Sequence, residues 1–527
     1  MKKKLSILFS LIISLIMATG FTQPMPVSEY NQRDWLTPMR LVCGTMNEDF
    51  QISRIGAIEE PLNPLFFNQS STTSKWAARM VFETLLVWND AGYDFKPVLA
   101  EDWYLFDDGI TIRMYLKEDV VFSNGNPFNA DNIVSMKEYA LDHQGSPMHR
   151  VWSKVNYIAT EGNYTVYFTL HNPGQIEFLH LLALPAASIV FVLSEYDDSN
   201  SWTRYRGTGM HVICHIISGE RIVFYPNSIA NPSNIRCFDG CCLIERRKEI
   251  YIIHDRSFIE VMISAGYMDM FICDGMTNGI TTNGFFPWPW PGRFPPGSIY
   301  IGGIWLLPYS NPINNPITIN FNMQNDYLSN ILVREAIAYG IDRQVFNDIF
   351  HGSINSAVSD APWNFHSELY SGILREFDVD LARYRLVEAG HPAISLELIL
   401  PQNEVYQVMA EIAGGSLAQV GIELSISILD QQTFNQRVQE GDFELALSTL
   451  NFASASAESV LESIIPLLHY EDGFLSYNLK QELNNLRMNI CPLVRLEKTL
   501  GIQGNLANHL PMLNLGWGSN AAVWRTS

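Results

Sequence analysis

Residues 283–298, NGFFPWPWPGRFPPGS, restrict the fold more than any other part of the sequence. A proline lacks a backbone N–H and has a fixed φ, so this proline-rich run breaks helices and cannot occupy a central strand. We therefore expect the stretch to form a crossover between two separately folded lobes. Because regular structure cannot bury Trp288 and Trp290 here, we predict that both line a binding site.

The segments on either side of this stretch have regular patterns. Residues 74–88 have the apolar spacing of a single helix, and another helix is expected to start at Asn129 or Asp131, either of which can cap it. Strands and helices alternate between residues 396 and 450, which indicates an α/β lobe.

The N-terminus has the pattern of a secretory signal peptide. Lysines at positions 2–4 precede the apolar run LSILFSLIISLIMA (5–18), and small residues follow it. We predict a signal peptide over residues 1–20; the alternative is an uncleaved N-terminal anchor, although the run is shorter than the roughly 20 residues of a membrane span. No lipobox cysteine follows, so the protein is expected in the periplasm or at the cell surface without a lipid anchor.

Charge and cysteine content narrow the class of protein. The formal net charge is −21, whereas a nucleic-acid binder needs a basic face, so no nucleic-acid partner is expected. Seven cysteines in an oxidising compartment allow disulfides but leave at least one thiol unpaired within the chain. Cys237, Cys241 and Cys242 crowd one segment; we expect a local disulfide or free thiols there rather than a metal site, because zinc sites usually have four regularly spaced ligands.

Enzyme signatures are absent from the sequence. There is no GxSxG elbow and no HExxH helix, so we expect no catalytic residues, no cofactor and no secreted hydrolase activity. His211 and His215 flank Cys214 on an expected strand, where alternation would put both histidines on one face. A metal pair is conceivable in that geometry, but we expect structural histidines.

Six segments, taken in order, carry the most specific pattern in the chain. They are residues 81–137, YTVYFTLHNP (164–173), RGTG (206–209), NILVREAIAYGIDRQVF (330–346), DVDLARYRLVEAG (378–390) and residues 417–448. In this order they resemble the extracytoplasmic solute-binding proteins of the peptide/nickel ABC transporter class, which include oligopeptide- and dipeptide-binding proteins. The match is close at FSNGNPFNAD (122–131).

The resemblance implies an α/β fold of two lobes that close on a ligand by a hinge. This is the periplasmic-binding-protein fold (class II-like, cluster C) with an extra N-terminal subdomain. Applied to this chain, the resemblance places lobe I at residues 38–70, 208–300 and 497–527. It places the subdomain at 71–207 and lobe II at 301–496.

The resemblance also draws attention to a missing acid. Relatives that bind linear peptides place an aspartate just after the strand that matches FELALSTL (443–450), where it pairs with the peptide amine. Here the segment continues as NFASASA, with Ala453 or Ser454 at the aligned position and Glu458 as the nearest carboxylate. This implies an altered ligand, such as a blocked or cyclic peptide, a sugar or a neutral compound, or else a degenerate paralogue.

Aromatic and amide side chains on loops are the candidate ligand-binding residues. They are Phe67, Asn68, Trp288, Trp290, Trp305, Asn320, Asn322, Phe452, Ser454 and Trp517. For any single tryptophan, packing in a core is the alternative.

We therefore expect a monomeric solute-binding protein of an ABC importer. It would capture a peptide or related small solute and deliver it to permease subunits in the membrane. A secreted sensor on the same fold, or a binder of a sugar or a nickel complex, remains the alternative.

Overall fold

The structure is a computed structural model of the chain, which divides into two units, Met1–Asp49 and Phe50–Ser527. All of the residues that the structure describes belong to the second unit. They are residues 52–57, 72–89, 94–192, 205–227, 247–253, 262, 267–268, 270–272, 299–301, 304–308, 316–349, 354–356, 359–362, 374–450, 452, 456–468, 474–518 and 521–525. The predicted signal peptide lies outside them, and within them no helix has the length and apolarity to cross a bilayer.

An eight-stranded mixed sheet takes its strands from three distant parts of the sequence. Its order is β10 (His211–Ile217), β11 (Arg221–Pro226), β12 (Arg247–Ile252), β1 (Ile52–Ala57), β13 (Met270–Ile272), β22 (Ala521–Arg525), β15 (Ile304–Pro308) and β14 (Ile299–Ile301). β1 is parallel to β12 and β13, whereas β22 is antiparallel to β13 and β15. The first and last described strands therefore lie in the same sheet.

A six-stranded sheet forms the second large layer. Its order is β17 (Ile354–Ser356), β21 (Met512–Gly518), β16 (Pro316–Phe321), β20 (Leu445–Thr449), β18 (Ile394–Pro401) and β19 (Ile422–Leu429). β18 is parallel to β19 and β20, and β16 is antiparallel to its two neighbours. Every residue of β16 is buried, as expected of a central strand that is covered on both faces.

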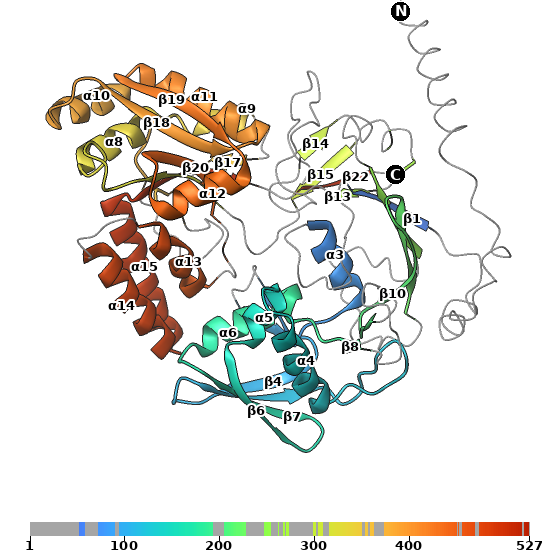
Figure 1. The fold of residues 1–527 in the computed structure, drawn as a ribbon. Coiled ribbons are helices and arrows are strands. Elements are labelled where there is room, and N and C mark those ends of the chain that lie inside the picture. The colour runs from blue at the N-terminus through green and yellow to red at the C-terminus, as the bar shows by residue number, and fades with distance from the viewer. Residues whose placement is uncertain are drawn as a thin grey trace, which may run out of the picture. The chain divides into compact units, whose positions relative to one another are not determined.

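Helices cover both faces of the six-stranded sheet (Figure 1). Ile317, Ile319 and Phe321 pack in one core with α8 (Ile331–Gly340), α10 (Val379–Glu388) and α11 (Glu404–Ala418). The opposite face packs against α12 (Gln431–Glu440), α13 (Ala457–Ile464), α14 (Phe474–Met488) and α15 (Pro492–His509) through smaller apolar clusters. α9 (Gln344–Ile349) and the 3₁₀ turn η9 (Ile465–Leu467) complete this part.

A four-stranded antiparallel sheet is formed by residues that lie between β1 and β10 in the sequence. Its order is β4 (Ala100–Leu105), β5 (Thr111–Leu116), β7 (Thr165–Leu170) and β6 (Val155–Glu161). Alternate residues of β5 and β7 are buried against α4 (Ala130–Asp142), α5 (Pro147–Trp152) and α6 (Gln175–Leu182), which Figure 1 shows on one side of this sheet. The 3₁₀ turn η4 (Pro185–Ala187) follows α6. Two further pairs of strands form small sheets: β2 (Leu86–Asn89) with β3 (Asp94–Pro97), and β8 (Phe191–Val192) with β9 (Tyr205–Arg206).

The predicted cap of α4 is confirmed at Asn129. Its side chain accepts a hydrogen bond from the Asp131 N–H at 3.0 Å, and the Asn132 side chain accepts one from the Asn129 N–H at 2.8 Å. Two otherwise unpaired N–H groups of the first turn are thus satisfied by a reciprocal pair of side chains.

The helix predicted over residues 74–88 is wrong in its second half. α3 (Thr72–Val81) ends at Val81, and β2 follows. The Gly209 N–H donates to the Val81 carbonyl oxygen at 3.0 Å, and a Cβ at Gly207 would lie 1.8 Å from that same oxygen. The RGTG segment therefore ends the helix, and local apolar spacing could not reveal a contact with residues so far away in the sequence.

The prediction that His211 and His215 share one face of a strand is also wrong. β10 shifts register between Ile213 and His215, which pair with consecutive residues of β11. Consecutive residues of a strand point to opposite faces, so the bulge at Cys214 separates the two histidines. Burial lowers the pKa of His215, and Arg221 and Arg247 lower it further, which favours a neutral ring.

The described cysteines differ in state. Cys214 is disulfide-bonded, whereas Cys491 is an exposed free thiol at the start of α15. A disulfide fits an oxidising compartment. The crowded segment with Cys237, Cys241 and Cys242 lies outside the described residues.

Candidate functional site

The chain passes twice between the two large sheets. Residues 309–315 connect β15 of the eight-stranded sheet to β16 of the six-stranded sheet, and residues 519–520 connect β21 back to β22. Both passages are at the same end of the six-stranded sheet, because Pro316 at the start of β16 pairs with Trp517 at the end of β21. The two connections therefore begin and end at neighbouring strand ends of the six-stranded sheet.

Strand pairing shows where the chain passes from one sheet to the other. β14 and β15 follow the proline-rich stretch at 283–298 and belong to the eight-stranded sheet, so the first passage comes after β15. β21 pairs with β16, and β22 joins the eight-stranded sheet, so the return comes after β21.

We define the crossing edge by Pro316, Pro401, Thr449 and Trp517. The Leu450 N–H donates to the Pro316 carbonyl oxygen at 2.9 Å, which brings the end of β20 to the start of β16. The parallel strands β18 and β20 also end here, and ligands of open α/β sheets bind at the carboxyl ends of such strands. The crossing edge is therefore the candidate ligand site of the six-stranded sheet.

The polar groups described at the crossing edge are uncharged. The Tyr406 hydroxyl, from the first turn of α11, lies 2.5 Å from the Thr449 hydroxyl. Burial raises the pKa of Tyr406, so its hydroxyl stays protonated. Sequence reasoning missed both residues, although a search for polar side chains directly after the parallel strands would have found Tyr406.

Trp517 is a predicted ligand-binding residue that lies at the crossing edge. Its side chain is only 1% exposed, and its indole N–H has no hydrogen-bond partner among the residues that the structure describes. A buried N–H without an acceptor is unfavourable by about 1–3 kcal/mol. Such a donor is suited to an uncharged acceptor, such as a ligand carbonyl or hydroxyl oxygen.

The first carboxylate after β20 is not available to a ligand amine. Glu458 is fully buried, and Arg495 Nη2 lies 2.8 Å from its Oε1 and 3.0 Å from its Oε2. Arg495 is itself fixed by hydrogen bonds to the carbonyl oxygens of Leu486 and Asn489. The buried charge of Glu458 is thus neutralised within the chain.

Two of the predicted ligand-binding residues lie away from the crossing edge: Asn320 is in β16, and Asn322 directly follows this strand. Asn320 is buried in the middle of the strand, and its Oδ1 accepts from the Thr318 hydroxyl at 3.2 Å. Asn322 Nδ2 donates to the carbonyl oxygens of Gly441 (3.0 Å) and Phe443 (2.7 Å). Both amides make contacts that hold this sheet and its turns together.

The other predicted residues are described in part or not at all. Phe452 is half-buried and packs against the apolar cluster beneath α13. Trp305 lies in β15, where its backbone pairs with Trp524 and Tyr300. Phe67, Asn68, Trp288, Trp290 and Ser454 lie outside the described residues.

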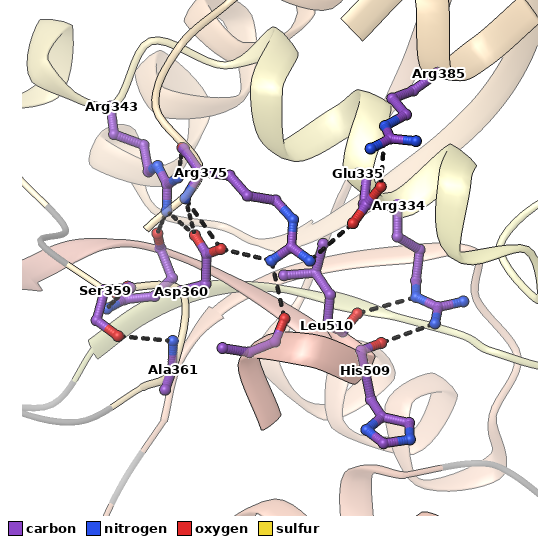
Figure 2. A network of polar contacts seen from close by, with 12 residues as sticks. Arg334, Glu335, Arg343, Ser359, Asp360, Ala361, Arg375, Arg385, His509 and Leu510 are labelled. Carbon is purple, nitrogen blue, oxygen red and sulfur yellow. Dashed lines mark hydrogen bonds and ion pairs between the residues drawn. The ribbon is translucent and has the colours of Figure 1, made fainter. Parts of the chain in front are cut away.

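A cluster of buried charged groups lies beside β21 and α8 (Figure 2). Asp360, fully buried, lies between Arg343 at 2.9 Å and Arg375 at 2.7 Å, and Arg375 also pairs with Glu335 at 2.9 Å. Arg334 donates to four backbone carbonyl oxygens, two of which belong to His509 and Leu510. Because these groups satisfy one another, we assign the cluster to holding loops on the sheet and not to ligand chemistry.

Within the described part of the chain, no three His, Cys, Asp or Glu side chains gather into a group that could hold a metal ion. The uncharged groups at the crossing edge can form hydrogen bonds and apolar contacts with a solute.

Comparisons with known proteins agree with this geometry. A family model described as "Bacterial extracellular solute-binding proteins, family 5 Middle" matches residues 94–228 and 297–465, more than half of the chain. A protein of Escherichia coli (strain K12) named "Probable ABC transporter periplasmic-binding protein SapA" is 23% identical over 496 residues, which cover 85% of this chain and 84% of that protein.

Two solved structures show the same fold. NikA from Brucella suis in complex with Fe(III)-EDTA has a TM-score of 0.70 and 20% identity, covering 89% of this chain and 95% of that chain. The periplasmic binding protein DppA from Helicobacter pylori in complex with the peptide STSA has a TM-score of 0.64 and 17% identity, covering 90% and 94%. The α/β fold with two lobes is therefore the fold of this chain.

Proposed function

Since this chain belongs to family 5 of the bacterial extracellular solute-binding proteins, we propose that it captures a small solute between two lobes and delivers it to the permease of an ABC importer. The observation that carries the proposal is the pair of short connections between the two large sheets at the crossing edge. A solute that contacts both lobes stabilises the closed state and so shifts the population toward it. The role is binding and not catalysis, as in the relatives of the family.

We propose a division of the chain that follows the strands. The eight-stranded sheet represents lobe I, the six-stranded sheet with its helices represents lobe II, and the four-stranded sheet with α4–α6 represents the extra subdomain. Relative to the sequence-based boundaries, lobe II begins at β16 and the final return begins after β21. This division supports a hinge between the two large sheets, next to the paired residues Pro316 and Trp517.

We propose that the ligand is a peptide or a related solute without a free amine at the usual position. Peptide is the default class because the DppA structure holds the peptide STSA. Glu458 and Glu462 are the carboxylates described between the end of β20 and Leu468, and both are already in ion pairs with arginine. A blocked or cyclic peptide, or a neutral solute, therefore fits better than a linear peptide whose amine needs a counter-charge.

Trp517, Phe452 and Trp305 remain proposed ligand contacts, as do Asn320 and Asn322. Phe67, Asn68, Trp288, Trp290 and Ser454 also remain in the proposal, on the sequence argument alone. Trp517 has the strongest support, because its buried indole N–H still needs an acceptor.

Secretion across the cytoplasmic membrane is part of the same proposal. The lysine-led apolar segment at the N-terminus and the disulfide at Cys214 both support a site of action outside the cytoplasm.

Calorimetry with matched peptides tests the ligand class. Peptide pools would be titrated as free-amine and as N-acetylated forms of the same sequences, with a neutral oligosaccharide pool in parallel. We expect the N-acetylated peptides to bind at least as tightly as the free ones. Binding of the oligosaccharide pool without binding of either peptide pool would overturn the peptide assignment.

Ser454→Asp tests the missing acid separately. If the substitution restores the amine-pairing carboxylate, the affinity for free-amine peptides should rise relative to N-acetylated peptides, by roughly tenfold for about 1.4 kcal/mol. Ser456→Asp is the matched control, because Ser456 caps α13 with its hydroxyl and an aspartate can keep that cap. An equal effect of both substitutions would refute the alignment of this loop.

A further inference from the structure

Four charged side chains close a ring between two distant parts of the chain. Lys154 precedes β6 and Glu177 lies in α6, whereas Glu462 lies in α13 and Arg487 in α14. Lys154 Nζ is 3.0 Å from Glu177 Oε1 and 3.4 Å from Glu462 Oε1. Arg487 Nε is 3.1 Å from Glu177 Oε2, and Arg487 Nη2 pairs with Glu462 Oε1.

The ring joins the four-stranded-sheet part to the helices of the six-stranded sheet, where α14 contacts α6 (Figure 1). Lys154 and Glu177 come from the first part, and Glu462 and Arg487 come from the second. Charges alternate around the ring, so each cation contacts one carboxylate of its own part and one of the other part. Two of the four ion pairs therefore cross between the parts.

Local structure positions the ring. Glu177 lies in the first turn of α6, where the helix dipole favours a carboxylate, and its side chain is 7% exposed. Gly174 caps this helix with φ +150°, and a Cβ there would lie 3.3 Å from Glu177 Oε2. Burial lowers the pKa of Arg487, but Glu177 and Glu462 raise it more, so its guanidinium stays charged.

The ring can open without leaving an unpaired charge. If the two cross pairs separate, Lys154 keeps Glu177 and Arg487 keeps Glu462, so each part retains a neutral ion pair. A protein is strongly destabilised when one partner of a buried ion pair is lost, because a buried charge is left uncompensated. Opening of this ring leaves every charge with a partner. A cavity of about 270 Å³ is lined by all four side chains, so water can reach the ring as it opens.

We propose that this ring is a reversible electrostatic latch that holds the subdomain against lobe II and biases the unliganded protein toward its closed state. The inference rests on the proposed function, since it assumes two lobes that open and close. With the latch, fewer unliganded molecules are in the open state. Less of the solute's binding free energy is therefore used to close the lobes.

Exchange of charges within one part tests the latch. Glu462→Arg with Arg487→Glu keeps the α13–α14 ion pair but places like charges opposite each other in both cross pairs. We expect a larger radius of gyration than the wild type by small-angle X-ray scattering of the ligand-free protein at low salt. Adding Lys154→Glu and Glu177→Lys restores opposite charges across the ring and should restore the wild-type radius.

A milder variant and a salt series guard against misfolding. Glu462→Gln with Arg487→Gln removes both cross pairs and should raise the ratio of open to closed molecules by roughly three- to thirty-fold, from the usual strength of two partly exposed pairs. In the wild type, 1 M NaCl reduces the Debye length to about 3 Å and should move the radius of gyration in the same direction. Circular dichroism verifies that each variant is folded.

The matched control exchanges an ion pair whose two residues both belong to the helices of the six-stranded sheet. Glu482 and Lys498, 3.7 Å apart on α14 and α15, can be exchanged as Glu482→Lys with Lys498→Glu, and the radius should not change. The wild-type radius of gyration in both folded ring variants would overturn the latch. Scattering of the ligand-free protein tests the latch separately from the proposed function. A protein that binds no peptide could still show the change in radius, and a protein whose radius does not change could still bind peptide.

Discussion

Asp360→Asn should destabilise the protein more than most single substitutions. Asp360 is fully buried and lies between two guanidinium groups, as Figure 2 shows. Its carboxylate accepts from Arg343 Nη1 at 2.9 Å, from Arg375 Nη1 at 2.7 Å and from the Arg375 backbone N–H at 3.2 Å. The substitution removes the negative charge while keeping the side-chain volume.

The magnitude follows from what is left behind. The Arg343 side chain is only 5% exposed, and burial already lowers its pKa despite the neighbouring Asp360. Without Asp360 its charge has carbonyl oxygens as partners, from Asn514 and Arg375, but no carboxylate contact. Removing one partner of a buried ion pair typically lowers the free energy of unfolding by about 3–5 kcal/mol, and we expect a loss in this range.

Urea unfolding at pH 7, followed by circular dichroism, measures this loss from the midpoint and slope. Asp380→Asn is the matched control, because Asp380 is 95% exposed in a 3.4 Å pair with Arg383. We expect a change of less than about 0.5 kcal/mol for the control. A loss of under about 1 kcal/mol for Asp360→Asn would refute the assignment of the cluster to fold stability.

Two further predictions concern α3 and α6. Gly207→Ala should lower the free energy of unfolding by about 3 kcal/mol, because its Cβ would lie 1.8 Å from the Val81 carbonyl oxygen. In the control Gly415→Ala, in α11, the added Cβ meets nothing within 4 Å, and the free energy of unfolding should rise by about 0.5–1 kcal/mol. A lower urea midpoint in both variants would contradict this contrast. Burial, assisted by Arg495, lowers the pKa of His180 to about 3. The unfolded chain therefore binds this proton first as the pH falls, and stability present above about pH 6.5 is lost on the way down to about pH 3, including about 2 kcal/mol between pH 7 and pH 5. His180→Phe should remove that part of the loss in urea titrations at the two pH values, and an unchanged pH slope would count against a neutral buried ring.

Much of the architecture could be predicted because its signals are local. Strand and helix alternation after residue 396 reports side chains that face one core, and Asn129 precedes a helix as a cap should. The ordered segments also predicted the family, because each one corresponds to a unit of local structure such as the turn and helix start at 122–131.

The misses come from contacts between distant residues. The end of α3 depends on Gly207 and Gly209, and the bulge at Cys214 depends on pairing with β11. In the candidate site, Trp517 could be named from its aromatic character, but the unpaired state of its indole N–H depends on the packing around it.

Native mass spectrometry of the protein with a peptide library tests the central claim most directly. The account predicts one small solute bound per chain, drawn from the peptides, with N-acetylated or cyclic members retained at least as well as linear free-amine peptides. Retention of linear free-amine peptides alone would contradict the argument from the neutralised Glu458. Failure to retain any member of peptide, sugar and metal-chelate libraries would contradict capture of a solute.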